Sequence, residues 1–193
     1  MRFRSALWTL FFAGMALSHC AGEKIEELTF RVNPDLLECE IMDIDLGFAF
    51  SPPKGCLPLP DSLVAAVREK VVLSDSFPID PRHIFFSTED QFLCLASALP
   101  GLSGDHGDLT AYQDAMGEKW KQQQINRASF RYGDYLIHQT RVVSAEQVIY
   151  KLVIRAGNGK YFQIDYILPR GRLPEKIETI ESSIGSLKKI TTP

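Results

Sequence analysis

Apolar and polar residues alternate in several parts of the chain, a pattern typical of strands with one buried face. The first such run is 43–50, where every second residue from Ile44 to Phe50 is apolar, and Pro52-Pro53 ends it. We therefore predict one strand over 43–50. By the same criteria, further strands are expected at 28–32, 84–87, 92–99, 135–143, 148–155 and 161–168.

Three other segments repeat apolar residues every three or four positions, which indicates amphipathic helices. The first follows Asp61-Ser62, the second is capped by Asp108, and the third opens with Pro174. Lys188-Lys189 ends the third segment, where positive side chains suit the negative end of a helix dipole. Together these segments predict the α+β class, an antiparallel sheet with helices packed on it.

Simple hairpin closure fixes the register of the last three predicted strands. One face of this meander is apolar and is expected to be core. On the opposite face Lys151 lies across from Asp165, with His138 and Gln163 nearby. Three interpretations of that face stay open: a solvated surface, a polar patch in which these four residues bind a ligand, or a surface that a helix covers in part.

The first twenty residues have the three parts of a bacterial signal peptide. Arg2 and Arg4 form a positive start, and the apolar run 6–17 is too short to span a bilayer comfortably. This predicts export to the periplasm or cell envelope. The chain is therefore divided into a signal peptide, a linker with a first strand, and a single α/β domain, at 1–20, 21–42 and 43–193.

Two processing routes are open at the end of this leader. Leu17-Ser18-His19-Cys20 resembles the lipobox of bacterial lipoproteins, in which Cys20 would be acylated and become the mature N-terminus. His19 departs from that motif, because a small residue normally precedes the cysteine. Ordinary cleavage after Ala16-Leu17-Ser18 would instead leave no anchor. A membrane contact is expected only through such a lipid.

Composition excludes several classes of protein. The chain has 193 residues, 45% of them hydrophobic and 23% charged, which suits one soluble globular domain. Its formal net charge is −3, and removal of Arg2 and Arg4 with the leader makes it about −5. Nucleic-acid binders concentrate Lys and Arg on one face, and the sequence has no basic run. A nucleic-acid partner is therefore not expected.

Few residues in the sequence are candidates for metal binding or catalysis. Asp105-His106-Gly107-Asp108 gathers side chains that can ligate a metal, but a site needs three or four converging ligands, and a loop is expected here. Cys56 stands beside Lys54 in a turn and is weighed as a nucleophile. Cys94 lies in an apolar run and is expected to be buried. No cofactor and no metal are predicted.

Segments near the start and at the end of the predicted domain resemble the PsbP-like family. Gly47–Cys56 is similar to the opening strand and turn of that family, with Cys56 where a Trp is usual. Phe162–Pro169 and Ile180–Ile184 are similar to its last strand and closing helix. The resemblance implies an α/β/α sandwich around an antiparallel sheet. It also implies an exported assembly or accessory factor, commonly without enzymatic activity.

Export and the shortage of reactive groups together favour a non-catalytic envelope protein that binds another envelope protein or a small ligand. The alternative is a hydrolase, or a metal- or ligand-binding protein, that works through the His106 loop or the His138 sheet face.

Replacement of Cys20 by Ala distinguishes the two routes of processing. If Cys20 is acylated, the substitution releases the protein into the soluble fraction and abolishes lipid labelling, because acyl chains alone hold it at the membrane. Fractionation and mass spectrometry of the mature N-terminus measure this. An unmodified N-terminus at His19 or Ala21 in the natural chain would contradict acylation.

Overall fold

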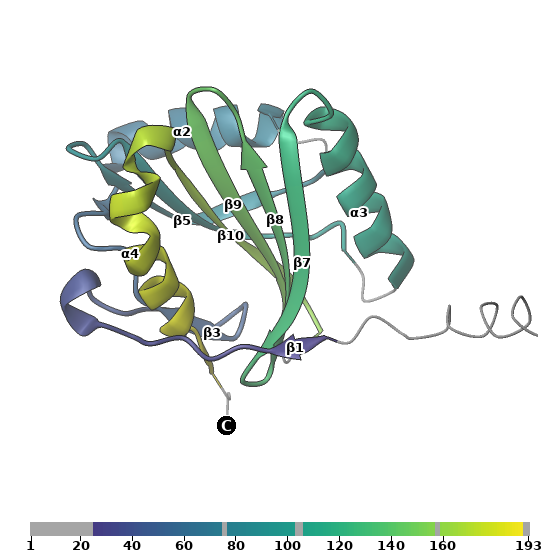
Figure 1. Cartoon of the computed structure of the whole chain (residues 1–193), viewed down its shortest axis with the longest axis horizontal. Helices are drawn as coiled ribbons and strands as arrows, with labels where there is room; N and C mark the ends of the chain where they lie inside the picture. The colour runs from purple at the N-terminus through teal and green to yellow at the C-terminus, as the bar shows by residue number, and fades with distance from the viewer. Residues whose placement is uncertain (1–24, 75–76, 103–105, 157–158, 191–193) are drawn as a thin grey trace, which may run out of the picture.

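The computed structural model describes residues 25–74, 77–102, 106–156 and 159–190. The predicted signal peptide and Cys20 lie outside these ranges, as does Asp105. Within them, a large sheet runs through the middle of the molecule, and helices lie on both of its faces (Figure 1). In spatial order its strands are β1 (Glu26–Glu27), β7 (Gln124–Tyr132), β8 (Tyr135–Val143), β9 (Gln147–Arg155), β10 (Tyr161–Pro169), β6 (Phe92–Ala98), β5 (Asp80–Ser87) and β4 (Leu57–Pro58).

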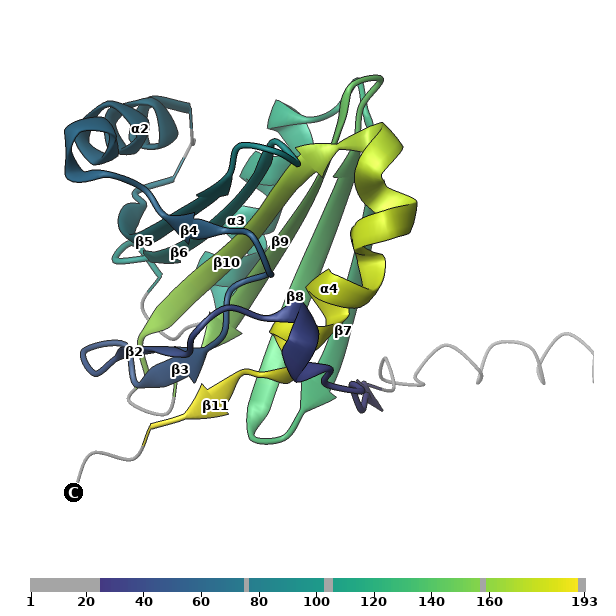
Figure 2. The same cartoon turned by 90° about the vertical axis from the view of Figure 1, so that its left-hand side faces the viewer.

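A second, smaller sheet and the helices form the outer layers. The small sheet has the order β11 (Lys188–Lys189), β3 (Phe48–Phe50) and β2 (Ile41–Asp43). The helices are α2 (Asp61–Ser74), α3 (His106–Lys119) and α4 (Leu173–Gly185), with short 3-10 turns at η1 (Pro34–Leu36) and η2 (Arg170–Arg172). Figure 2 shows α4 and β11 in front of the large sheet and α3 behind it. The predicted α+β class is confirmed.

The register predicted for the meander is confirmed across three strands. Val143 pairs with Val148, and Arg155 pairs with Tyr161, as simple hairpin closure requires. The meander nevertheless has a fourth strand that the prediction missed, because β7, flanked on its outer side only by the two-residue strand β1, has mostly exposed side chains and no clear apolar alternation. The two-residue turn Gly133-Asp134 joins β7 to β8, and Gly133 has a φ of 53°.

The single strand predicted over 43–50 is wrong. The segment is a hairpin in which β2 and β3 flank a turn, and Ile44 is 65% exposed. Asp43 begins the turn: its Oδ1 accepts a hydrogen bond from the Leu46 amide at 2.9 Å. Gly47 ends it with a φ of 73°, which a residue with a side chain rarely adopts. Asp and Gly therefore outweigh the apolar alternation here.

The N-terminal segment packs against the core without forming the strand expected at 28–32. The Phe30 ring lies 5.1 Å from Tyr132 and 6.0 Å from Phe130, measured between centroids. Its Cβ would be 2.7 Å from a Cβ added at Gly185, so only glycine fits where this segment crosses α4. The observed strand is β1, which pairs with β7 in parallel through Glu27 and Arg131.

Buried serine hydroxyls attach α4 to the strands below it. Ser183 Oγ donates to the Ser51 carbonyl at 2.7 Å and accepts from the Tyr166 hydroxyl at 3.0 Å. Ser186 Oγ accepts from the Ser51 amide at 2.8 Å. Ser183 in α4 and Ser186 directly after it therefore have a structural role. Lys188 and Lys189, expected at the end of the helix dipole, instead form β11 and pair with β3.

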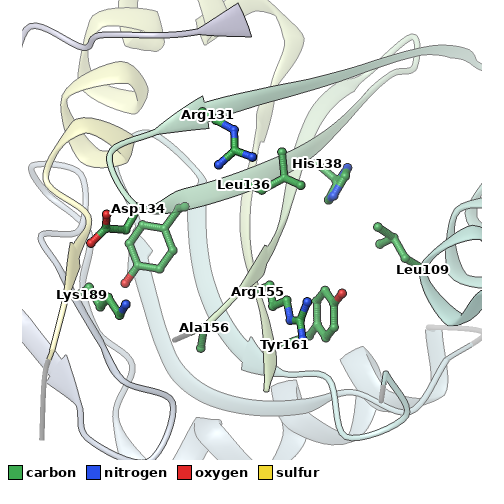
Figure 3. Close-up of a pocket in the computed structure, with 10 residues that line it drawn as sticks. Leu109, Arg131, Asp134, Leu136, His138, Arg155, Ala156, Tyr161 and Lys189 are labelled. Carbon is green, nitrogen blue, oxygen red and sulfur yellow. The ribbon is translucent and has the colours of Figure 1, made fainter. Parts of the chain in front are cut away.

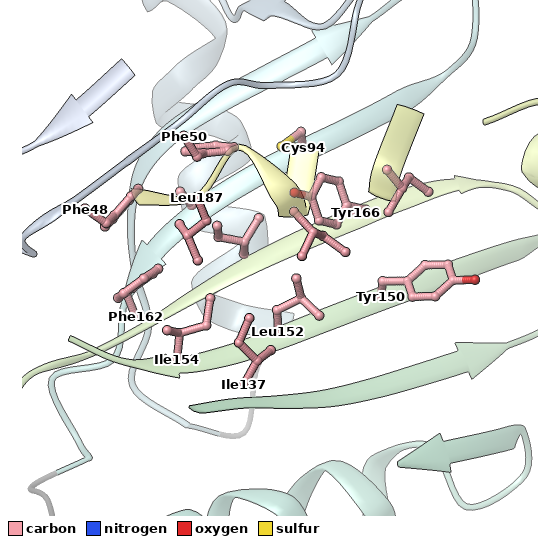
Figure 4. Close-up of a cluster of buried hydrophobic side chains, with 14 of the residues drawn as sticks. Phe48, Phe50, Cys94, Ile137, Tyr150, Leu152, Ile154, Phe162, Tyr166 and Leu187 are labelled. Carbon is pink, nitrogen blue, oxygen red and sulfur yellow. The ribbon is translucent and has the colours of Figure 1, made fainter. Parts of the chain in front are cut away.

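Apolar side chains fill both sides of the sheet. The larger core lies between the sheet, α4 and the small sheet, where the Phe48 and Phe162 rings stack 4.3 Å apart (Figure 4). The smaller core lies under α3, where Leu109, Tyr112 and Met116 pack over Val153. The large sheet is therefore covered on both faces. Among the described residues, none of the helices has the length and apolar character needed to cross a membrane.

Replacement of Ile184 by Asp should unfold the protein at ambient temperature or lower its stability by about 3 kcal/mol or more, because a carboxylate would be buried without a partner. Ile184 is 4% exposed in the larger core, whereas Ile177, two turns earlier on the same helix, is 37% exposed. Urea unfolding followed by circular dichroism measures the effect. Ile177→Asp is the matched control and should change stability far less; equal effects would contradict the docking of α4.

Candidate anion-binding cavity

The polar patch predicted on the sheet is buried under α3. Lys151 Nζ lies 3.1 Å from Asp165 Oδ2, and the side chains are 7% and 3% exposed. Gln163 Nε2 donates to the same oxygen at 2.7 Å. The Tyr112 hydroxyl of α3 donates to Gln163 Oε1. The interpretation as a solvated face is therefore wrong for these residues, and a helix covers them.

This buried network holds α3 in place and has no direct access to solvent. The structure brings Lys151, Asp165 and Gln163 together as the sequence predicted, with Lys151 opposite both Asp165 and Thr140. Each charged or amide group meets a complementary group, which buried polar side chains require. We therefore assign these three residues to folding, so that only the fourth predicted residue, His138, is a candidate for ligand contact.

His138 lies apart from this network, at the side of a surface cavity. Its Nδ1 is 2.9 Å from Ser129 Oγ on the neighbouring strand β7, and the pair is partly buried. The cavity has a volume of about 250 Å³. It is lined by Leu109, Arg131, Asp134, Tyr135, Leu136, His138, Arg155, Ala156, Tyr161 and Lys189 (Figure 3).

Strand register explains how the cavity gathers residues from distant parts of the sequence. Arg131 pairs with Leu136 across the β7–β8 hairpin, and Arg155 pairs with Tyr161 across β9 and β10. Arg155 comes directly after Ile154, the partner of Ile137, so it lies next to Leu136 on the neighbouring strand. The side chains of Arg131, Leu136, Arg155 and Tyr161 therefore form one row across four strands. The opposite wall includes Lys189 of β11 (Figure 3).

Positive charge dominates the lining. Arg131, Arg155 and Lys189 are exposed, and none of them forms an ion pair with another residue that the structure describes. The lining contains a single carboxylate, that of Asp134. Such an excess of fixed positive charge in a concave surface attracts anions.

Tyr135 borders this cavity, but its side chain belongs to the larger core, where its ring lies 6.1 Å from that of Phe162. The side chain is 3% exposed, and its hydroxyl has no hydrogen-bond partner among the described residues. Burial, assisted by the charge of Asp134, raises the pKa of Tyr135 to about 12, so the phenol keeps its proton at neutral pH. The hydroxyl is closed to solvent, so it is not among the groups that a ligand in the cavity can reach.

Sequence reasoning missed most of this cavity for identifiable reasons. Arg131 and Asp134 belong to the missed strand β7 and its turn, although Gly133-Asp134 is a turn pair typical of two-residue hairpins. Lys189 was assigned to a helix end. Arg155 ends the strand predicted over 148–155, but the approach of β11 to the same cavity depends on tertiary contacts.

The other reactive candidates lie in unfavourable surroundings. Cys56 is fully buried, and burial, followed by the charge of Asp90, raises the pKa of its thiol to about 12, which disfavours a nucleophilic role for Cys56. Cys94 is buried as expected, and Cys39 is exposed; all three are free thiols. His83 Nε2 lies 3.0 Å from Asp43 Oδ2 and ties β5 to the hairpin.

The predicted metal-competent loop is partly helical. α3 begins at His106, so Asp108 lies in its first turn and is not the cap that was predicted, while Asp105 lies outside the described residues. Over the ranges that the structure describes, no group of three or more His, Cys, Asp or Glu side chains could hold a metal ion.

Comparison with known proteins identifies the fold. No protein-family model matches the chain. The search of curated proteins found no significant match. Among solved structures, the chain is similar to the solution structure of cyanobacterial PsbP (CyanoP) from Synechocystis sp. PCC 6803, with a TM-score of 0.52 and 13% sequence identity. The match covers 90% of this chain and 99% of that one. The chain therefore has a PsbP-like fold, as its motifs suggested.

Replacement of Lys151 by Met should lower the free energy of unfolding by about 3–5 kcal/mol, because it leaves the Asp165 carboxylate buried without its countercharge. The double variant Lys151→Met/Asp165→Leu should recover most of this loss, because no charge is then buried. Urea unfolding of both variants measures the difference. A single variant that keeps full stability would contradict the structural role and return Lys151 to the candidates for binding.

Proposed function

We propose that the chain is an exported, non-catalytic protein of the cell envelope that acts as a binding or assembly accessory factor. We further propose that it meets its partner or ligand at the cavity lined by Arg131, Arg155 and Lys189. The observation that carries this proposal is the cluster of cations without ion-pair partners among the described residues.

Export is supported by the leader sequence. Its positive start, short apolar run and small residues are those of a signal peptide, and Cys20 offers an acylation site at its end. The PsbP-like fold is compatible with such a protein but does not by itself indicate a function.

The non-catalytic part of the proposal rests on the chemistry of the lining. Acid–base catalysis commonly pairs a histidine or carboxylate with a second group of matched pKa. His138 is accompanied in the cavity by three cations and one carboxylate, which is a better arrangement for holding a negative group than for activating water. The hydrolase alternative requires a nucleophile, and the Ser129–His138 pair is its one candidate at this site.

Capture experiments from solubilised envelope test the proposal. The mature chain should retain a stoichiometric partner, and Arg155→Glu should lose it, because the reversed charge repels an anionic group in the cavity. Arg170→Glu, at the opposite end of β10, is the matched control and should retain the partner. Loss of the partner from both variants, or from neither, would contradict recognition at the cavity. Hydrolytic activity that disappears in Ser129→Ala would favour the enzyme alternative.

A further inference from the structure

The lining of the cavity indicates the chemistry of the group it holds, an inference that rests on the proposed function. We propose that the cavity binds a carboxylate carried on a short apolar body, with Arg131, Arg155 and Lys189 facing the carboxylate.

The donor set indicates an oxyanion. Arginine side chains present paired N–H donors that match the two oxygens of a carboxylate, and lysine adds a point charge. A neutral or cationic ligand would leave these positive charges uncompensated.

The rest of the lining indicates an apolar body. Leu109, Leu136, Ala156 and Tyr161 line the same cavity, and all except Leu136 are buried. Inorganic phosphate would leave these side chains without a contact. A volume of about 250 Å³ is below the range of about 300–1,000 Å³ typical of pockets for drug-sized ligands, so the body is small.

Charge balance favours one negative group over several. Three cations face the cavity, and Asp134 offsets one of them. His138 is engaged with Ser129 through Nδ1. Asp134 also faces any bound anion and opposes it, which makes its replacement by Asn a variant expected to gain affinity.

Calorimetric titration of the full mature chain with three probes tests this chemistry. Benzoate carries both a carboxylate and an apolar body, benzyl alcohol lacks the charge, and inorganic phosphate lacks the apolar body. We expect benzoate to bind at least about tenfold more tightly than either of the others, because only benzoate satisfies both parts of the lining. Equal binding of benzyl alcohol or phosphate, or no binding of benzoate at millimolar concentration, would overturn the proposal.

Variants localise the effect to the cavity. Arg155→Gln should weaken benzoate binding by about tenfold or more. Asp134→Asn should strengthen it, and Arg170→Gln should leave it unchanged. Arg155 and Asp134 are exposed and are not part of either core, so their variants should keep the fold. An unchanged affinity in Arg155→Gln would overturn the proposal.

Competition distinguishes the two sources of the carboxylate. If benzoate displaces a captured envelope partner, the partner supplies the group, for example from its carboxyl terminus; if benzoate binds without displacing it, the group belongs to a free small molecule. Partner capture that depends on Arg155 while benzoate fails to bind would reject the carboxylate but leave the proposed function standing. Benzoate binding by a chain that captures no partner would support the carboxylate but reject the proposed function.

Discussion

The ion pair between Lys151 and Asp165 lies in the middle of the sheet, and removing both charges from water carries a large desolvation cost. That cost is offset only if the strands β9 and β10 keep their register and if Gln163 and Tyr112 complete the network. A shift of one strand by one residue would turn its charged side chain toward the apolar core under α4 and leave the other charge buried without its partner. The pair therefore links sheet register to the position of α3.

Coverage on both faces restricts where a ligand can bind. α3 seals the middle of one face and α4 with the small sheet seals the other, so neither face offers a broad open surface. The row from Arg131 to Tyr161 lies at the end of the sheet, next to the β7–β8 turn, where the two layers leave a concave space. The cavity is thus a consequence of the layered architecture and needs no specialised loop.

How much of the fold and of the cavity could be predicted from the sequence depended on whether local or distant contacts determine the structure of each segment. The register of β8, β9 and β10 followed from hairpin closure, because short turns leave few alternatives. The prediction of a single strand over 43–50 failed because Asp43 and Gly47 form a turn, which the alternation of apolar residues does not reveal. The pairing of Lys189 with β3 brings the cavity a residue that no local pattern could have assigned to it. Of the residues that line the cavity, only His138 was therefore predicted as a binding residue.

The parallel pairing of β1 with β7 sets a distance between the cavity and any anchor at the start of the mature chain. Glu27 lies beside Arg131, a residue of the cavity, and is seven residues from Cys20. A fully extended tether of that length reaches at most about 25 Å. With an acyl group on Cys20, the protein could not range far into the periplasm, and its cavity would sample only the layer of solvent next to the lipid headgroups.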